Sequence, residues 1–294
     1  MAVVAATGFF DGVHIGHRLV LETLSRTARE RGEESLVVTF WPHPRNVLQD
    51  DARNLRLLSS LEEKKALILS AGVDRVEVLP FTRQFSRLST REYLRDVLKG
   101  TLGCDTVVLG YDNRMGSDLL DPESVARVAA EEGLKVVRVA SVDTGSGETV
   151  SSTRIRRCLS EGNVSLAADM LGYRYTLHGV VVAGDRLGRT IGFPTANMQL
   201  YEPLKLIPSN GVYSVDVETL GGYFRGMTNI GVRPTVSGGG ERRVETHIFG
   251  FDEDIYGLDI KISFRQKIRD EKRFPSLEQL RLQLESDRES ALKD

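Results

Sequence analysis

The chain has 294 residues, enough for two domains, and its 40% hydrophobic and 27% charged residues are typical of a folded globular protein. With 39 Lys and Arg against 41 Asp and Glu, the charges are balanced and spread along the sequence, without the basic footprint of a nucleic-acid-binding protein. We therefore expect no nucleic acid as partner. No apolar segment approaches the length of a membrane span, so we expect no membrane as partner either.

The first half alternates short β-branched segments with segments whose apolar residues recur every three or four positions. We expect strands at 3–6, 36–40, 76–79, 106–109 and 135–140, and helices at 19–31, 60–71, 90–98, 122–132, 152–160 and 165–171. Strands that alternate with helices in this way predict βαβ units with right-handed crossovers. The first half is therefore expected to be a doubly wound α/β domain with a parallel sheet.

The pattern changes near residue 173. Strand-like segments follow, separated by turns rich in Gly, Pro and Asn, at 176–183, 211–218, 223–229, 243–249 and 258–265. No helix is expected before 275–290. This pattern predicts a small antiparallel β-barrel with a C-terminal helix, and thus two domains, 1–172 and 173–294.

The two cysteines and the N-terminus predict a cytoplasmic protein. Cys104 and Cys158 form no CxxC pair and no metal-ligand cluster, so we expect them to be reduced thiols. The apolar start, 1–10, lacks the basic residues of a signal peptide and runs into Asp11, so we expect it to contain a strand. The sequence predicts no particular oligomeric state.

A glycine-rich loop, TGFFDGVHIGH at 7–17, joins the first strand to the first helix. A strand–loop–helix junction at the carboxyl edge of a parallel sheet is where such folds bind ligands, and the helix N-terminus favours phosphate. His14 and His17 are three apart, so both can lie on the first turn and donate hydrogen bonds to a phosphoryl group. A capped helix with two surface histidines is the simpler interpretation of this spacing alone.

Three further polar loops are expected at the same edge. They are WPHP at 41–44, GYDNRMG at 110–116 and VSSTRIR at 150–156. Ser and Thr are good helix N-caps, but together with arginines they can also hold a phosphate. Four such loops at one edge predict a binding cleft.

In the second half, a loop with glycines at 184, 188 and 192 leads to Thr195 and Asn197. In an extended chain these two side chains point the same way, and both offer the neutral oxygens that Mg²⁺ accepts when phosphates supply the charge. Thr and Asn that cap backbone groups in a turn are the alternative.

Glu245 lies in RVETHIF at 243–249. If this strand alternates, Glu245 shares a face with His247 and Phe249, and its carboxylate is either a general base for a hydroxyl or a solvated surface group. His247 has no assigned partner. The charged tripeptide RDE at 269–271 is either surface or a hydrogen-bonding group for a heterocycle.

The strings FFDGVHIGH, TFWPHP, GYDNRMG and VSSTRIR resemble the FMN adenylyltransferase module of bacterial bifunctional riboflavin kinase/FAD synthetases, in the HxGH nucleotidylyltransferase superfamily, over roughly residues 3–172. The resemblance implies that ATP and FMN give FAD, with His14 and His17 catalytic and His43 near the FMN phosphate. The further nucleotide-binding residues that it implies are Gly8, Phe10, Asp11, Gly16, Asp112, Ser152, Thr153 and Arg156.

The strings GRTIGFPTANM, KLIPSNGVYSV, TNIGVRPTV, VETHIFGFDEDIYG and IRDEKRFPSLEQL resemble the riboflavin kinase family over roughly residues 174–290. The resemblance implies Thr195 and Asn197 at a Mg²⁺–ATP site and Glu245 as the base for the riboflavin hydroxyl. Arg269 and Asp270 are implied near the flavin. The glycines that it implies over the ATP phosphates are Gly184, Gly188 and Gly192.

Three alternatives remain at this point. One module could be active while the other only binds flavin, or the whole chain could be a non-catalytic flavin- or nucleotide-responsive module. An RNA-binding barrel is a third, but the basic stripe and stacking aromatics that it needs are missing. Consumption of ATP separates an enzyme from a binding module.

Overall fold

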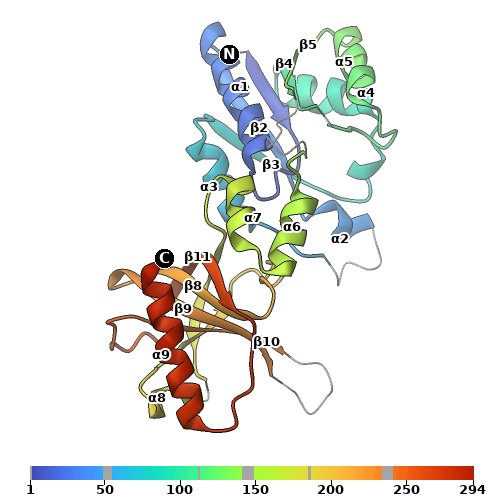
Figure 1. Ribbon diagram of the computed structural model, residues 1–294. Helices are drawn as coiled ribbons and strands as arrows, with labels where there is room; N and C mark the ends of the chain where they lie inside the picture. Colours follow the sequence, from blue (N-terminus) through green and yellow to red (C-terminus); the bar gives the residue numbers. More distant parts are fainter. Residues whose placement is uncertain (1, 49–54, 112, 141–148, 185–186, 234–240) are drawn as a thin grey trace. The chain divides into compact units, whose positions relative to one another are not determined.

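The computed structural model describes residues 2–48, 55–111, 113–140, 149–184, 187–233 and 241–294 (Figure 1). The chain divides into two compact units, Met1–Ser152 and Thr153–Asp294. None of the helices in these described ranges combines the length and the apolarity that crossing a membrane requires.

The first unit is built on a five-stranded parallel sheet with the strand order β3-β2-β1-β4-β5. The strands are β1 (Val3–Thr7), β2 (Glu34–Trp41), β3 (Arg75–Pro80), β4 (Cys104–Leu109) and β5 (Lys135–Arg138). The strand order reverses between β1 and β4, which is where folds of this kind bind ligands at the carboxyl edge of the sheet. This sheet confirms the expected α/β fold.

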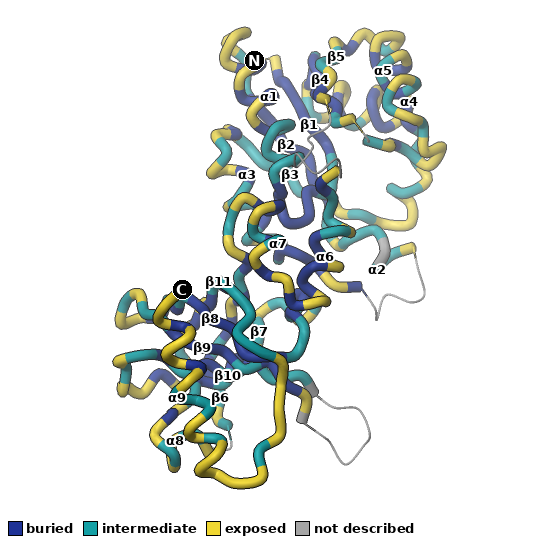
Figure 2. Tube along the Cα trace, in the orientation of Figure 1, coloured by how far each residue is buried: buried dark blue, intermediate teal, exposed yellow. Residues whose placement is uncertain are grey.

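Helices cover both faces of this sheet. They are α1 (Ile15–Arg31), α2 (Pro44–Leu48), α3 (Leu61–Ser70), α4 (Thr90–Glu92), which continues as the π-type η3 (Tyr93–Thr101), and α5 (Pro122–Glu131). Along β1, Val4 and Ala6 pack in one apolar cluster with α1, while Val3 and Ala5 pack in the other with η3 and α5. Because both faces are covered, the central strands are buried throughout (Figure 2).

The second unit is a closed antiparallel barrel with the strand order β10-β7-β6-β11-β8-β9. The strands are β6 (Thr176–Val182), β7 (Ala196–Leu200), β8 (Gly211–Thr219), β9 (Gly222–Arg233), β10 (Glu241–Ile248) and β11 (Asp259–Arg269). Val244, Thr246 and Ile248 of β10 are buried inside the barrel, where the hydroxyls of Thr246 and Thr228 lie 2.7 Å apart. The expected barrel is thereby confirmed.

Four short elements of the structure were not predicted: α2, η2 (Phe85–Arg87), β7 and α8 (Leu187–Thr190). The expectation of no helix in the second half before the last one was therefore wrong at α8. Strand β7 has the sequence ANMQL, in which only alternate residues are apolar, and its five residues gave too short a pattern to detect.

The helices α6 (Ser152–Glu161) and α7 (Val164–Leu171) lead into the barrel. Helix α7 lies next to β11, where the Ser165 hydroxyl donates to the carbonyl of Arg265 at 3.0 Å. In this division by contacts both helices go with the barrel, except for Ser152 itself.

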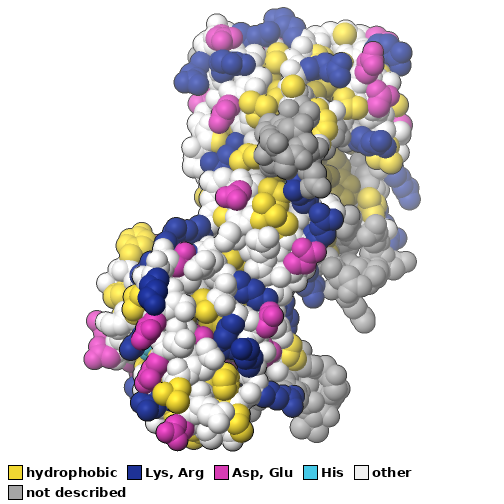
Figure 3. All heavy atoms as spheres, in the orientation of Figure 1, with side chains coloured by type: hydrophobic (Ala, Val, Ile, Leu, Met, Phe, Trp, Pro, Cys, Tyr) yellow, Lys and Arg dark blue, Asp and Glu magenta, His cyan; other side chains and the backbone are white. Residues whose placement is uncertain are grey.

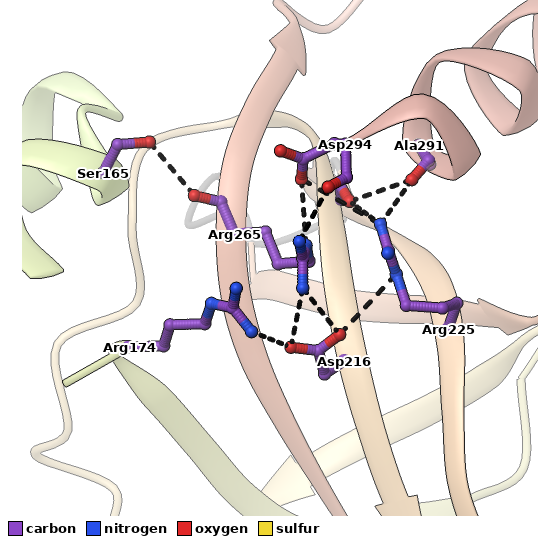
Figure 4. A network of polar contacts seen from close by, with 8 residues as sticks. Ser165, Arg174, Asp216, Arg225, Arg265, Ala291 and Asp294 are labelled. Carbon is purple, nitrogen blue, oxygen red and sulfur yellow. Dashed lines mark hydrogen bonds and ion pairs between the residues drawn. The ribbon is translucent and has the colours of Figure 1, made fainter.

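Helix α9 (Leu277–Lys293) packs on the outer side of β8 and β9 through an apolar cluster that includes Phe193, Val212, Met227 and Ala291. Its C-terminal end is held by polar contacts (Figure 4). Arg265 donates to the carboxylate of Asp294 at 3.1 Å and to its carbonyl at 2.7 Å.

A second group of contacts joins strands to this helix end. Arg225 of β9 donates to the carbonyl of Ala291, and Asp216 of β8 lies 3.3 Å from Arg265 and 3.6 Å from Arg225. Cations near a helix C-terminus are favourable because the unsatisfied carbonyls there carry partial negative charge. The barrel strands thus fix the end of α9.

A buried ion pair ties the middle of α9 to the end of β11. The Asp287 side chain is 1% exposed, and Arg269 donates to both of its oxygens, at 2.9 Å and 2.7 Å. Gln283 adds a third bond at 2.9 Å. Removing one partner of such a pair leaves an uncompensated charge in a poorly solvated place.

We therefore expect Asp287→Asn to destabilise the barrel by about 3–5 kcal/mol, because the Arg269 guanidinium loses its counter-ion. Hydrogen exchange of barrel amides measures this loss separately from the first unit. The control is Glu285→Gln, which breaks only the exposed pair with Arg281 and should cost no more than about 0.5 kcal/mol. Equal protection of barrel amides in the two variants would contradict this role for Asp287.

Candidate functional sites

The loop after β1 follows an unusual backbone path. Phe10 and Val13 have φ angles of 48° and 36°, and Gly12 between them has 76°. Left-handed backbone is costly for a bulky or β-branched residue, and such strain is typical of functional loops. The path turns the chain sharply at the carboxyl edge of the sheet, so that α1 begins at Ile15.

His14 and His17 both lie at this helix start. His14 is the N-cap residue, and its Nδ1 accepts a hydrogen bond from the backbone N–H of His17 at 3.3 Å. Nδ1 is therefore unprotonated, which leaves the proton on Nε2. The two rings are stacked, with centroids 3.6 Å apart, and a Cβ on Gly16 would come within 3.3 Å of the His14 ring. The expected pairing of the histidines on the first turn is confirmed.

His17 is half-buried, and its Nδ1 atom is shielded from solvent. Burial lowers its pKa well below the usual value, and His14 and Lys64 lower it further, so the ring is neutral at pH 7. Among the described residues its Nδ1 has no hydrogen-bond partner, and Phe10 packs edge-on against it at 5.2 Å. A buried polar atom without a partner is costly, so this nitrogen is suited to a ligand.

The carboxylate of Asp11 holds the loop before α3. It accepts from the backbone N–H groups of Leu58 and Ser59 at 3.0 and 3.1 Å. The backbone carbonyl of Asp11 accepts from the Ser152 hydroxyl at 3.0 Å. Three segments far apart in sequence thus meet at this residue, and its implied contact with nucleotide stays a prediction.

Other expected site residues are distributed as follows. The His43 ring lies 5.3 Å from that of Phe9, in the loop after β1. Asn113, in the loop after β4, donates to the carbonyl of Thr7 at 3.1 Å. Asp112 lies outside the described residues. Thr153 and Arg156 follow Ser152 on α6.

Lys64 is a buried residue of this site that sequence reasoning missed. Its ammonium donates to the carbonyls of Phe9 at 3.2 Å and Phe40 at 3.5 Å, and burial lowers its pKa to about 8 although Asp11 opposes the shift. The available signal was its place on the apolar face of α3, four residues before buried Ile68.

In the barrel, three polar residues lie side by side on adjacent strands. Glu245 of β10 is directly opposite Asn197 of β7 and Asn229 of β9. Directly opposed residues share a face of the sheet, so these side chains lie on the face away from buried Val244 and Thr246. Asn229 was not singled out from the sequence, although its string TNIGVRPTV was.

The glycine loop lies close to Asn197. A Cβ on Gly184 would be 2.1 Å from the Asn197 amide nitrogen, and one on Gly188 would be 2.2 Å from the carbonyl of Phe193. Gly192 has a φ of 84°, which favours glycine. These positions allow the loop to approach the residues around 193–197 closely, while Asp185 and Arg186 lie outside the described residues.

The donor atoms here fit Mg²⁺. Thr195 and Asn197 offer a hydroxyl and an amide oxygen, and Mg²⁺ binds through a few oxygens while substrate phosphates supply negative charge. In the described ranges, no group of three or more His, Cys, Asp or Glu side chains is placed to hold a metal ion. A Mg²⁺ ion held here would take its negative charge from substrate phosphates.

Arg269 and Asp270 have other partners in this structure. Arg269 binds Asp287, as described above. Asp270 is exposed and lies 2.7 Å from Lys267, which lowers the pKa of its carboxyl. Contact of either residue with a flavin stays a prediction.

Two families match successive parts of the sequence. A family model for FAD synthetase matches residues 1–154, and one for riboflavin kinase matches residues 171–293. The bifunctional riboflavin kinase/FMN adenylyltransferases of Listeria monocytogenes and Escherichia coli are each 37% identical, over 97% of this chain and 90% of their own length.

A solved structure is also similar over the whole chain. A crystal structure described as a macrolide-efflux protein from Streptococcus pneumoniae matches with a TM-score of 0.92 and 33% identity, over 99% of this chain and 93% of its own. The two share a fold, while the curated relatives carry the names of two transferase activities.

Lys64 gives a pH dependence to the stability of the first unit. Its folded pKa of about 8 is below the unfolded value of 10.5, so between these pH values the unfolded chain binds more protons and stability rises with pH. We expect the unaltered protein to gain on the order of 3 kcal/mol over Lys64→Met in this window. Urea unfolding followed by the fluorescence of Trp41, the single tryptophan, measures the gain. If the difference in unfolding free energy between the two proteins is constant from pH 8 to 10.5, the lowered pKa of Lys64 is refuted.

Proposed function

The chain belongs to the bifunctional riboflavin kinase/FMN adenylyltransferase family, and from this premise we propose which residues carry each of its two reactions. The protein makes FAD in two steps. It phosphorylates riboflavin to FMN with ATP, and it transfers the adenylyl group of a second ATP to FMN, releasing pyrophosphate.

Adenylyl transfer is assigned to the loop after β1. An FMN phosphate oxygen attacks the α-phosphorus of ATP, and the bond to pyrophosphate breaks, so no protein nucleophile is needed. Nε2–H is the ring donor of His14, because its Nδ1 accepts from the His17 backbone. Together with the unpartnered Nδ1 of neutral His17 and the first backbone N–H groups of α1, it would stabilise the charge that develops on the phosphates.

The residues around these histidines have positioning roles in this proposal. Gly8, Phe10 and Gly16 shape the loop, and Asp11 fixes it to the segment before α3. Asp112, Ser152, Thr153 and Arg156 are proposed to bind the nucleotide, and the bond from Ser152 to the Asp11 carbonyl supports this for Ser152. His43 is proposed to bind the FMN phosphate, on the strength of its place beside Phe9.

Riboflavin phosphorylation is assigned to the outer face of β7 and β10. Glu245 would take the proton of the riboflavin 5′-hydroxyl, whose oxygen attacks the γ-phosphorus of ATP as ADP leaves. Thr195 and Asn197 would hold Mg²⁺, which neutralises phosphate charge when bound, with Gly184, Gly188 and Gly192 over the phosphates. Asp270 and Arg269 are proposed to lie near the flavin. The position of Arg269 at the end of β11 supports this for Arg269.

The observation that carries this proposal furthest is the register of β7 and β10. It sets the expected base, Glu245, directly opposite the expected metal ligand, Asn197, although they are 48 positions apart in sequence (245 − 197). A general base and a metal–phosphate site must be adjacent for in-line transfer from ATP to a hydroxyl.

We also propose the boundaries and setting of the two domains. Residues 1–172 would form the adenylyltransferase and 173–294 the kinase, supported by the family matches and by the start of β6 at Thr176. The buried thiols of Cys104 and Cys158 support a cytoplasmic protein. On the face shown in Figure 3, basic and acidic side chains are interspersed, which favours small-molecule substrates over nucleic acid.

A product analysis tests the function as a whole. The protein is incubated with riboflavin, ATP and Mg²⁺, and the flavins are separated by chromatography over time. FMN that appears first and is followed by FAD supports both assignments. Unchanged riboflavin, from folded protein, would overturn the kinase assignment.

The two sites are expected to be separable by mutation. Glu245→Gln should lower riboflavin phosphorylation at least about 100-fold because the base is lost, while FMN is still converted to FAD. His17→Ala should lower FAD formation about 100- to 1,000-fold and leave phosphorylation intact. Separate assays starting from riboflavin and from FMN measure the two rates. Loss of both reactions in either folded variant would mean that the sites are not independent.

A further inference from the structure

His247 of the VETHIF string lies on the outer face of β10, and the two reactions leave it without a role. It lies two positions after Glu245 on β10, so the two side chains share the outer face of that strand. Its neighbour across the pair with β9 is Met227, in the apolar cluster beneath α9. A histidine so close to the expected base merits a physical explanation.

The His247 ring is held by one hydrogen bond and two aromatic contacts. Nδ1 lies 2.8 Å from the backbone carbonyl of Pro194, and since a carbonyl only accepts, Nδ1 carries the proton. Phe193 and Phe249 lie at 5.1 and 5.7 Å from the ring, both at steep angles. Burial, and to a lesser extent Arg288, lowers the pKa of the ring, so it is neutral at pH 7.

The carbonyl that His247 binds belongs to the residue directly before Thr195. Pro194 has no N–H, so its carbonyl is the one backbone hydrogen-bonding group by which it can be held. Phe193 is fixed separately, because its N–H donates to Gly188 at 2.8 Å and its ring packs in the cluster with Met227 and Ala291. The bond from His247 thus holds the segment 193–195 against β10.

We propose that His247 is a positioning residue of the kinase site, which fixes the Pro194 carbonyl and so aligns the oxygens of Thr195 and Asn197 with Glu245. This inference rests on the proposed roles of Thr195 and Asn197 in holding Mg²⁺–ATP. It gives His247 a chemical task without contact to substrate. The donor at Nδ1 and the ring's packing are separable contributions, which makes the proposal testable.

Two substitutions separate the donor from the ring. His247→Phe keeps an aromatic ring between Phe193 and Phe249 but cannot donate to Pro194, whereas His247→Asn places an amide N–H near the position of Nδ1. We expect His247→Phe to raise the Mg²⁺ concentration for half-maximal riboflavin phosphorylation about five- to tenfold, the effect of losing one hydrogen bond. The phosphorylation rate of His247→Phe at saturating Mg²⁺ should change by less than about threefold, since Glu245 is unaltered. His247→Asn should stay within about twofold of the unaltered protein in both respects.

The matched control is His178→Phe, because His178 is exposed on β6 and contacts Tyr201 edge-on, away from the Pro194 segment. It should leave the Mg²⁺ dependence unchanged. Hydrogen exchange of barrel amides tests whether each variant is folded. If His247→Phe proves unfolded, His247→Asn decides the question. Hydrogen exchange of the Ala196 and Asn197 amides in His247→Asn must then match that of the unaltered protein.

Thr195→Ala separates failure of this inference from failure of the proposed function. Thr195→Ala should raise the Mg²⁺ concentration needed for half-maximal riboflavin phosphorylation. If His247→Phe raises this concentration little further in the double variant, the two residues act through one another. Fully additive effects, an unchanged Mg²⁺ dependence in His247→Phe, or a His247→Asn variant as impaired as His247→Phe would each overturn the positioning role. An unchanged Mg²⁺ dependence in Thr195→Ala would instead overturn the metal site itself.

Discussion

The first unit depends on the turn by which the chain leaves β1 and enters α1. Left-handed backbone at Phe10 and Val13 costs about 1–3 kcal/mol each, so the turn forms only where other contacts enforce it. Asp11, between them, accepts from the N–H groups of Leu58 and Ser59 and from the Ser59 hydroxyl, and bonds to a charged group contribute roughly 1.5–3 kcal/mol each. These bonds offset strain of similar size, and the turn that they hold places His14 and His17 stacked at the start of α1.

Much of the fold could be predicted because the long elements have clear periodicity. The central strands of the sheet are buried on both faces and read as continuous apolar segments, and the barrel strands alternate between glycine-rich turns. Helix α1 begins four residues earlier than its apolar pattern, since His14 caps it and Gly16 sits tightly against that ring. The short elements β7, α2 and α8 were missed, because four or five residues carry too little periodicity to distinguish a strand from a loop.

The candidate sites were predictable where chemistry is local in sequence and not where it depends on tertiary contacts. The pairing of His14 with His17 follows from their spacing. The burial of Lys64 against two carbonyls, and the bidentate bond of Arg269 to Asp287, join residues 18 to 55 positions apart and leave no mark on either segment alone. Arg269 illustrates the difficulty: a charged residue at a strand end reads equally as ligand-binding or as structural until its partner is seen.

The two units also differ in whether their sheets have edge strands. The barrel closes on itself, so each strand has two neighbours, whereas the sheet of the first unit ends at β3 and β5. Both of these edges carry charge: Arg75 on β3 pairs with Glu34 and Glu77, and Lys135 on β5 pairs with Asp105. A strand from another molecule that added to either edge would have to strip water from these side chains, which opposes aggregation by edge-to-edge pairing when the protein is concentrated.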